Sequence, residues 1–291
     1  MNPIQSRPPF RWNLQKAEQL GTLPQEGTEA YPEFLQDLRS CAAKVLAFSD
    51  NCDLVFVGRS PESLYDHLQG ALQDTHWQDR LQMLNISIGG WEVTSIEKEN
   101  PGALKAIEQQ FLALGLTPLQ ILARPHPVAF VDLVCGGSTF LSLYLLLLHW
   151  AARDGVPARV LCNKLRFIGI VEALKTSPNT WRWHQKAKWG NAPIPEVKNV
   201  SVPYRFWFYL GDQQHKVARW NPPFCWTETA MQEPPREFWH LQALGFARTL
   251  HLTGSSKTEK QHLVREMVQL PAMKEGWYRT LVMQIKAGVR G

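Results

Sequence analysis

Two short apolar segments, each leading through a turn of small residues into a helix, constrain the fold of this chain most strongly. The first is Asp-Leu-Val-Phe-Val-Gly at 53–58, and the second is Val-Ala-Phe-Val-Asp-Leu-Val at 128–134. Strands that are apolar on both faces are typical of a parallel sheet covered by helices on both sides. Ser60, followed by a proline and an acid, favours a helix over 61–72 with the serine as its N-cap. The second segment leads into an apolar helix predicted over 138–153.

The rest of the chain continues this alternation of strands and helices. The apolar periodicity predicts further strands at 85–88 and 158–170, and further helices at 32–48, 103–114, 236–251, 257–269 and 272–287. This order predicts an α/β fold with a mainly parallel sheet flanked by helices. Beyond Trp181 the pattern loosens before the last three helices, which predicts a Trp-rich, largely helical C-terminal extension.

The length of 291 residues suits one large domain or two smaller ones. Residues 1–30 are rich in Pro, Gln and Gly, so we expect an N-terminal arm there. The α/β core is expected at 31–175, followed by the Trp-rich, helical region at 176–291. Whether this last region packs on the core as part of one domain is left open by the sequence.

Several classes of protein are disfavoured by simple features of the chain. The first nine residues lack the apolar core of a secretory signal. The apolar stretch at 139–152 is about 14 residues long, short of the roughly 20 that span a bilayer, so no membrane span is expected. Five cysteines without metal-like spacing predict reduced thiols in a cytoplasmic protein. Nine histidines without an i, i+4 pair argue against a metal cluster.

Positive charge and tryptophan are concentrated in one part of the chain. Segment 159–220 carries a net charge of +8, whereas the whole chain carries +5, and seven of the twelve tryptophans fall within 181–239. The densest patch is 181–189, with Trp181, Trp183 and three neighbouring basic side chains. Such a region suits ligands that carry phosphates or stack on aromatic rings. A solvated basic face over an aromatic core is the equally open alternative.

The two strand-to-helix turns are the candidate phosphate loops. Ligands of open α/β sheets bind at the carboxyl ends of the strands, where both turns are expected. The turn at 135–139 is Cys-Gly-Gly-Ser-Thr, so its backbone N–H groups, two hydroxyls and a helix N-terminus can converge on one anion. Asp132, three residues before the turn, could accept hydrogen bonds from sugar hydroxyls or lie near a cation. Cys135 is either a reactive thiol or simply a small residue.

Segment 128–140 resembles the phosphoribosyl-pyrophosphate signature of type I phosphoribosyltransferases. That signature is a hydrophobic strand with two adjacent acids, followed by two apolar residues and a small Gly/Thr-rich loop. Asp132 matches the second acid, and Val131 stands where the first acid is expected. The turn at 58–60 resembles the pyrophosphate loop of the same family. The resemblance covers about 53–170 and implies a phosphoribosyltransferase-like core.

The resemblance also implies an activity and its residues. The chain would bind phosphoribosyl pyrophosphate, or a related sugar phosphate, together with Mg²⁺ and transfer the pentosyl phosphate to an unknown acceptor. The residues so implied are Asp132 and Arg59 as catalytic groups, and Gly58, Ser60, Gly136, Gly137, Ser138 and Thr139 as ligands of the donor. Stacking on tryptophans of the C-terminal region is one way in which the acceptor could be bound, and a homodimer is left open.

Two other functions stay open at this point. The missing first acid and the basic segment favour a non-catalytic protein that senses a nucleotide or sugar phosphate, or that binds nucleic acid, on the same fold. A nucleoside-phosphate hydrolase, with water as the acceptor, is the third hypothesis. The segment 254–258, Gly-Ser-Ser-Lys-Thr, resembles the end of a Walker A loop but lacks the first glycine and the preceding strand, so we expect a helix cap at 253–256.

Overall fold

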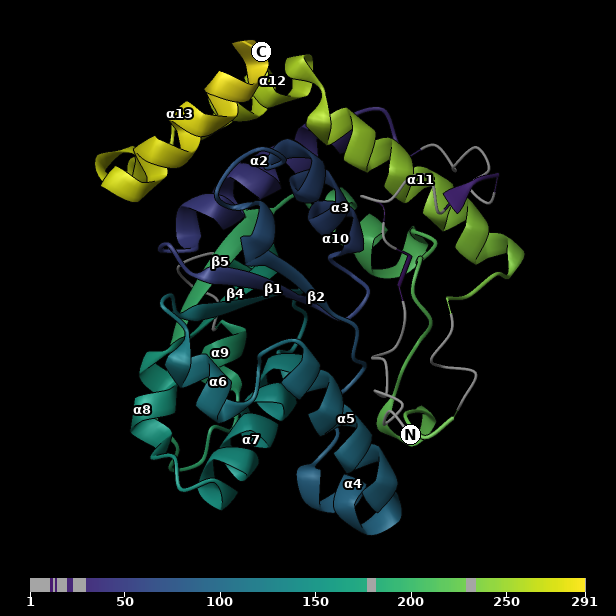
Figure 1. Cartoon of the computed structure of the whole chain (residues 1–291), viewed down its shortest axis with the longest axis vertical. Helices are drawn as coiled ribbons and strands as arrows, with labels where there is room; N and C mark the ends of the chain where they lie inside the picture. The colour runs from purple at the N-terminus through teal and green to yellow at the C-terminus, as the bar shows by residue number, and fades with distance from the viewer. Residues whose placement is uncertain are drawn as a thin grey trace, which may run out of the picture.

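A computed structural model describes residues 11–12, 14, 20–22, 30–176, 182–228 and 234–290. Five strands form one parallel sheet between two layers of helices (Figure 1). The strands are β1 (Asp53–Val57), β2 (Leu81–Leu84), β3 (Val128–Leu133), β4 (Leu165–Glu172) and β5 (Glu196–Val202). Their order across the sheet is β2-β1-β3-β4-β5, and every pair of neighbours is parallel. The predicted α/β fold with a mainly parallel sheet is therefore confirmed.

The described part of the chain contains the seven predicted helices and five shorter ones that the sequence did not predict. They are α2 (Phe34–Phe48), α3 (Glu62–Ala71), α4 (Val93–Glu99), α5 (Pro101–Ala113), α6 (Pro118–Ala123), α7 (Ser138–Arg153), α8 (Ala158–Asn163), α9 (Trp183–Lys186), α10 (Tyr204–Phe208), α11 (Phe238–Ser255), α12 (Lys257–Met267) and α13 (Gly276–Arg290). All seven predicted helices are present, with ends that shift by a few residues. Ser256 caps α12 by accepting a hydrogen bond from the backbone N–H of Glu259, so the predicted cap is confirmed.

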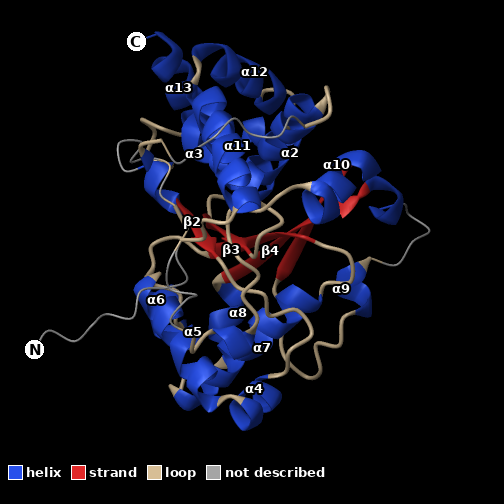
Figure 2. Ribbon diagram, turned by 90° about the vertical axis from the view of Figure 1, so that its right-hand side faces the viewer, coloured by secondary structure: helices blue, strands red, loops and turns tan. Residues whose placement is uncertain are grey.

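Both faces of the sheet are apolar. Successive side chains of a strand point to opposite faces, and both sets are apolar here. In β1, Leu54 and Phe56 point into one core, whereas Val55 and Val57 point into the other. Helices α2, α3 and α10–α13 cover the first face, and α4–α9 cover the second (Figure 2). Strands of this kind lack an alternation of polar and apolar residues, which is why β1 and β3 read as continuous apolar segments.

Three local predictions are wrong. The strand expected at 85–88 lies earlier, at β2; the backbone N–H of Ser87 donates to the carbonyl oxygen of Asn221 instead of to a neighbouring strand. The first part of the strand expected at 158–170 is helix α8, which begins directly after Pro157. Ser60 is not the N-cap of α3: that position is Pro61, and no side chain caps this end.

The sheet and its cores extend beyond residue 175. Strand β5 pairs with β4 along seven residues. The apolar pattern does not predict this strand, because only two of its side chains are buried. Helices α12 and α13 pack on α2 in the same core that covers the first face of the sheet. Near the N-terminus, Leu14 and Leu20 are buried against α11.

The apolar helix α7 lies inside the second core. Eight of its residues are buried, and none of the helices in the described ranges is long and apolar enough to cross a membrane. All five cysteines are free thiols, and Cys135 is the exposed one.

Candidate functional site

The strand order reverses between β1 and β3, and both candidate loops lie at this point. Helix α3 leaves β1 toward one face of the sheet, and α7 leaves β3 toward the other (Figures 1 and 2). A crevice between such diverging helices is where doubly wound α/β proteins bind their ligands. Gly58 and Gly137 have φ angles of 74° and 82°, a left-handed conformation that favours glycine.

A third loop, which follows β2, completes this end of the sheet. A Cβ on Gly58 would lie 3.4 Å from the carbonyl oxygen of Ile86. A Cβ on Gly89 would lie 3.0 Å from Thr139 Oγ1 and 3.1 Å from Ser138 Oγ. The loops after β1, β2 and β3 are therefore in contact, and the two loops chosen from the sequence belong to one site.

The segment 214–218 crosses the first turn of α3 and enters the same site. The Glu62 carboxylate accepts hydrogen bonds from the backbone N–H groups of Val217 at 2.8 Å and Ala218 at 3.0 Å. Lys216 Nζ donates a hydrogen bond to the carbonyl oxygen of Leu210. Glu62 thus fixes the segment that carries Lys216 against the beginning of α3.

Asp132 is the carboxylate at the centre of the site. It is 7% exposed, at the carboxyl end of β3, and its Oδ1 accepts a hydrogen bond from the backbone N–H of Leu133 at 2.7 Å. Burial raises the pKa of Asp132 to about 8, although the Leu133 N–H, a hydrogen bond with Thr139 and the charge of Lys216 oppose this change. Burial thus disfavours the charged form of this carboxyl group.

Arg59, in the loop after β1, and Lys216 are the cations of this site, and Lys216 interacts with Asp132. Burial lowers the pKa of Lys216 to about 8, with Arg59 acting in the same direction and Glu62, Asp212 and Asp132 acting against it. Burial also lowers the pKa of Arg59, and Glu62 opposes that shift. Within the described part of the chain, neither cation forms a salt bridge. Arg59 and Lys216 are thus half-buried positive charges without a salt bridge among the described residues, an arrangement that favours binding of an anion.

The remaining predicted residues line the loops with different exposure. Gly58, Arg59, Ser60 and Thr139 are half-buried, whereas Gly136 and Ser138 are exposed. Cys135 is exposed at the mouth of its loop, with Lys175 Nζ 3.7 Å from its Sγ. Because these residues belong to the loops that follow β1 and β3, all of them lie at the same end of the sheet.

Two of the tryptophans in the basic, aromatic patch are buried. Trp183 is buried: its ring packs on Phe140, and its Nε1 donates to Asn199 Oδ1 at 2.8 Å. Trp189 is also buried and contacts Phe167. Trp181 lies outside the described residues. Trp183 and Trp189 are therefore part of an aromatic core, one of the two alternatives that the sequence leaves open.

Metal ligands are sparse in the site. The described residues contain no group of three or more His, Cys, Asp or Glu side chains that could hold a metal ion. Near the two loops, Asp132 is the carboxylate at the strand end, and the oxygens of Glu62 already accept two backbone hydrogen bonds. A cation would therefore have to take most of its ligands from a bound substrate.

Lys216 and Glu62 are not among the site residues predicted from the sequence. Glu62 read as a helix-start acid, and Lys216 as one of eleven basic residues in a charged segment. No sequence signal links the two, because they are 154 positions apart and meet only through the fold.

No protein-family model matches the chain, and no match is found among curated proteins or solved structures.

Proposed function

We propose that the chain binds a phosphorylated, pyrophosphate-activated sugar at the carboxyl ends of β1 and β3 and transfers its pentosyl phosphate to an acceptor. The observation that carries the proposal is the pair of half-buried cations, Arg59 and Lys216, beside two glycine loops at the reversal of strand order. The resemblance to type I phosphoribosyltransferases supports the same assignment of the two loops. By that resemblance the core is phosphoribosyltransferase-like and the donor is phosphoribosyl pyrophosphate.

In this proposal each loop has its own task. Backbone N–H groups at 136–139, with the Ser138 and Thr139 hydroxyls, bind the 5-phosphate, as helix N-termini bind anions. Gly58, Arg59 and Ser60 hold the pyrophosphate, and Arg59 stabilises its charge as it leaves. Asp132 holds the ribose hydroxyls. By the resemblance, Asp132 would be the chain's own contact to a bound Mg²⁺ ion, and such an ion would supply positive charge to the pyrophosphate oxygens.

Donor binding tests the proposal directly. Isothermal titration calorimetry with phosphoribosyl pyrophosphate and Mg²⁺ should give saturable binding. Asp132→Asn should weaken it by roughly 1–3 kcal/mol, the cost of a charge-assisted hydrogen bond. Arg59→Ala should weaken it as well, whereas Lys188→Ala, which removes an exposed positive charge outside the site, should leave it unchanged. Absence of binding at millimolar donor would disprove the proposal.

A non-catalytic sugar-phosphate sensor is the second candidate, and Val131 favours it. Its side chain is fully buried in the core that α2 covers, so no acid occupies the position of the first acid in the signature. Binding of the donor without pyrophosphate release would identify a sensor. Release of pyrophosphate with an acceptor would identify a transferase, and ribose 5-phosphate formed without one would identify a hydrolase. A salt-dependent gel shift of RNA or DNA would support a nucleic-acid-binding role.

A further inference from the structure

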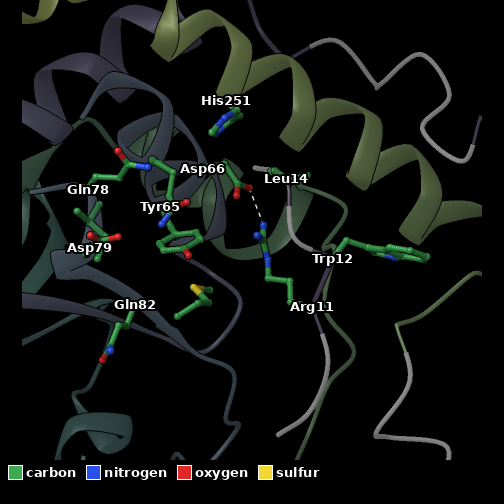
Figure 3. A pocket seen from close by; sticks show the side chains of 12 residues that line it. Arg11, Trp12, Leu14, Tyr65, Asp66, Gln78, Asp79, Gln82 and His251 are labelled. Atoms are coloured by element: carbon green, nitrogen blue, oxygen red, sulfur yellow. Dashed lines mark hydrogen bonds and ion pairs between the residues drawn. The ribbon is translucent and has the colours of Figure 1, made fainter. Parts of the chain in front are cut away.

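Two of the cavities that the described residues form lie away from the candidate site, and they differ in chemistry. The smaller, of about 360 Å³, lies beside α3 and contains the ion pair of Arg11 and Asp66, drawn as a dashed line in Figure 3. Because Arg11 Nη2 donates to Asp66 Oδ2 at 2.6 Å, these two charges satisfy each other. The larger cavity, of about 580 Å³, lies beside β5, the last strand in the order of the sheet, and its charges are arranged differently.

The larger cavity has a mostly apolar lining. It is surrounded by α2, β5, the turn Pro271–Lys274 and α13. Phe48, at the end of α2, is 38% exposed beside it. Four other side chains of the lining pack against the core on the α2 face of the sheet and stay partly open: Ala47, Leu270, Ala272 and Trp277. The volume and the apolar lining are typical of small-molecule sites, which commonly measure about 300–1,000 Å³.

The charged side chains of this lining differ in their exposure. Both acids, Asp50 and Glu275, are exposed, and so is Lys274. Lys44 and Lys198 are half-buried. Salt and water screen exposed charges more strongly than partly buried ones. The two half-buried lysines therefore determine the charge that a ligand meets inside the cavity.

Lys44 is the half-buried lysine whose charge is not balanced. Lys198 Nζ lies 2.8 Å from Glu196 Oε1 and is balanced by it. Lys44 Nζ donates to the uncharged carbonyl oxygen of Ser201 at 3.3 Å, and among the described residues it forms no salt bridge. One unbalanced ammonium group beside an apolar lining is complementary to a ligand with a single negative charge and an apolar body.

We propose that this cavity binds a small monocarboxylic acid with an apolar body, whose carboxylate accepts a hydrogen bond from Lys44 Nζ and whose body packs on Phe48 and Trp277. An ammonium group has three protons, so Lys44 can keep its bond to Ser201 and donate to the carboxylate as well. A dianion would bring a second charge for which the lining offers no half-buried, unbalanced partner. The proposal does not depend on the sugar-phosphate site at β1 and β3.

The test uses the full chain and a panel of carboxylates with aliphatic or aromatic bodies: hexanoate, octanoate, decanoate, phenylacetate and naphthoate, each added alone. At least one should raise the melting temperature and bind saturably in calorimetry. The primary alcohol with the same body, which lacks the negative charge, should bind roughly tenfold more weakly or worse. If no carboxylate binds at millimolar concentration, or if the alcohols bind equally well, the proposal is wrong and Lys44 only protects the free edge of β5.

Two variants locate the binding. Lys44→Gln removes the charge and should weaken carboxylate binding by roughly tenfold or more. Lys105→Gln, which removes an exposed lysine of α5, is the matched control and should bind normally. Should Lys44→Gln fail to fold, Ala272→Trp supplies the test by filling the cavity, with Gln269→Trp as its control, because Gln269 is exposed and not part of the lining. Binding that survives both cavity variants would place the ligand elsewhere and overturn the proposal.

Discussion

The indole ring of Trp183 covers Gly137, so closely that a Cβ on the glycine would lie 2.1 Å from the ring's Cε3. Gly137 is also the N-cap residue of α7 and has a φ of 82°. A glycine chosen from the sequence for its ability to approach a phosphate is thus required by packing and by backbone conformation. Trp183 holds the loop from one side, which leaves Gly136 and Ser138 on the exposed side.

Gly137→Ala should therefore destabilise the protein by about 1–3 kcal/mol, because the methyl group meets the indole and the left-handed conformation disfavours it. Donor binding should be lost with it. Gly136→Ala is the matched control, since a Cβ there meets nothing within 4 Å. Chemical denaturation with calorimetry would measure both effects. Equal stability of the two variants would show that Trp183 does not restrain the loop.

Trp183→Ala should cost about 3–5 kcal/mol, the usual loss for a large buried aromatic side chain. The variant loses the contact with Phe140 and the hydrogen bond to Asn199 in β5. Trp220→Ala is the control: this side chain is 56% exposed, and its loss should change stability by about 0.5 kcal/mol or less. If Trp183→Ala instead kept full stability and lost only product formation, Trp183 would bind the acceptor.

Glu62→Ala should release the segment 214–218 from α3. The N–H groups of Val217 and Ala218 would lose their acceptor, at a cost of about 1–3 kcal/mol for each group that stays buried. Lys216 would then be displaced, so donor affinity should fall together with the melting temperature. Glu62→Gln retains one acceptor oxygen and should lie between the wild type and the alanine variant. Unchanged donor affinity in Glu62→Ala would remove Lys216 from the proposed site.

Asp132 should make stability depend on pH in a defined direction. Its pKa is raised to about 8 from an ordinary value of 3.8, because burial penalises the charged form. Between these two values the folded state keeps a proton that the unfolded state has lost, so its contribution to stability falls as the pH rises. Asp132→Asn removes this dependence. The melting temperature of the variant should therefore rise relative to that of the wild type between about pH 5 and pH 8. A difference that is constant over this range would contradict the raised pKa.

Gly254→Ala should destabilise the contact between α3 and α11, although alanine favours a helix over glycine by about 1 kcal/mol. A Cβ on Gly254 would lie 2.2 Å from the carbonyl oxygen of His67, and one on Gly70 would lie 2.0 Å from that of His251. The backbones therefore touch, and an overpacked crossing costs about 1–3 kcal/mol. Gly288→Ala, in helix α13, has its nearest neighbour at 3.5 Å and should be neutral or stabilising. A stabilised Gly254→Ala variant would show that the helices can separate without cost.

The sequence by itself determined the elements whose signals are local. The continuous apolar segments of β1 and β3 require burial on both faces, and the helical periodicity of α2, α7 and the last three helices requires one face to be buried. The two glycine turns follow from the same pattern, because a buried strand that ends in small residues before a helix marks the edge where ligands bind. These features depend only on neighbours within a few residues.

The tertiary structure alone decided which distant residues meet. Strand β5 has mostly half-buried or exposed side chains, so its place in the sheet depends on backbone hydrogen bonds with β4 and leaves little trace in the apolar pattern. The pairing of Glu62 with the segment that carries Lys216, and the contact of Gly70 with α11, join parts of the chain more than 150 residues apart. Such contacts depend on the path of the whole chain, and periodicity encodes only that a side chain is buried, not what it is buried against.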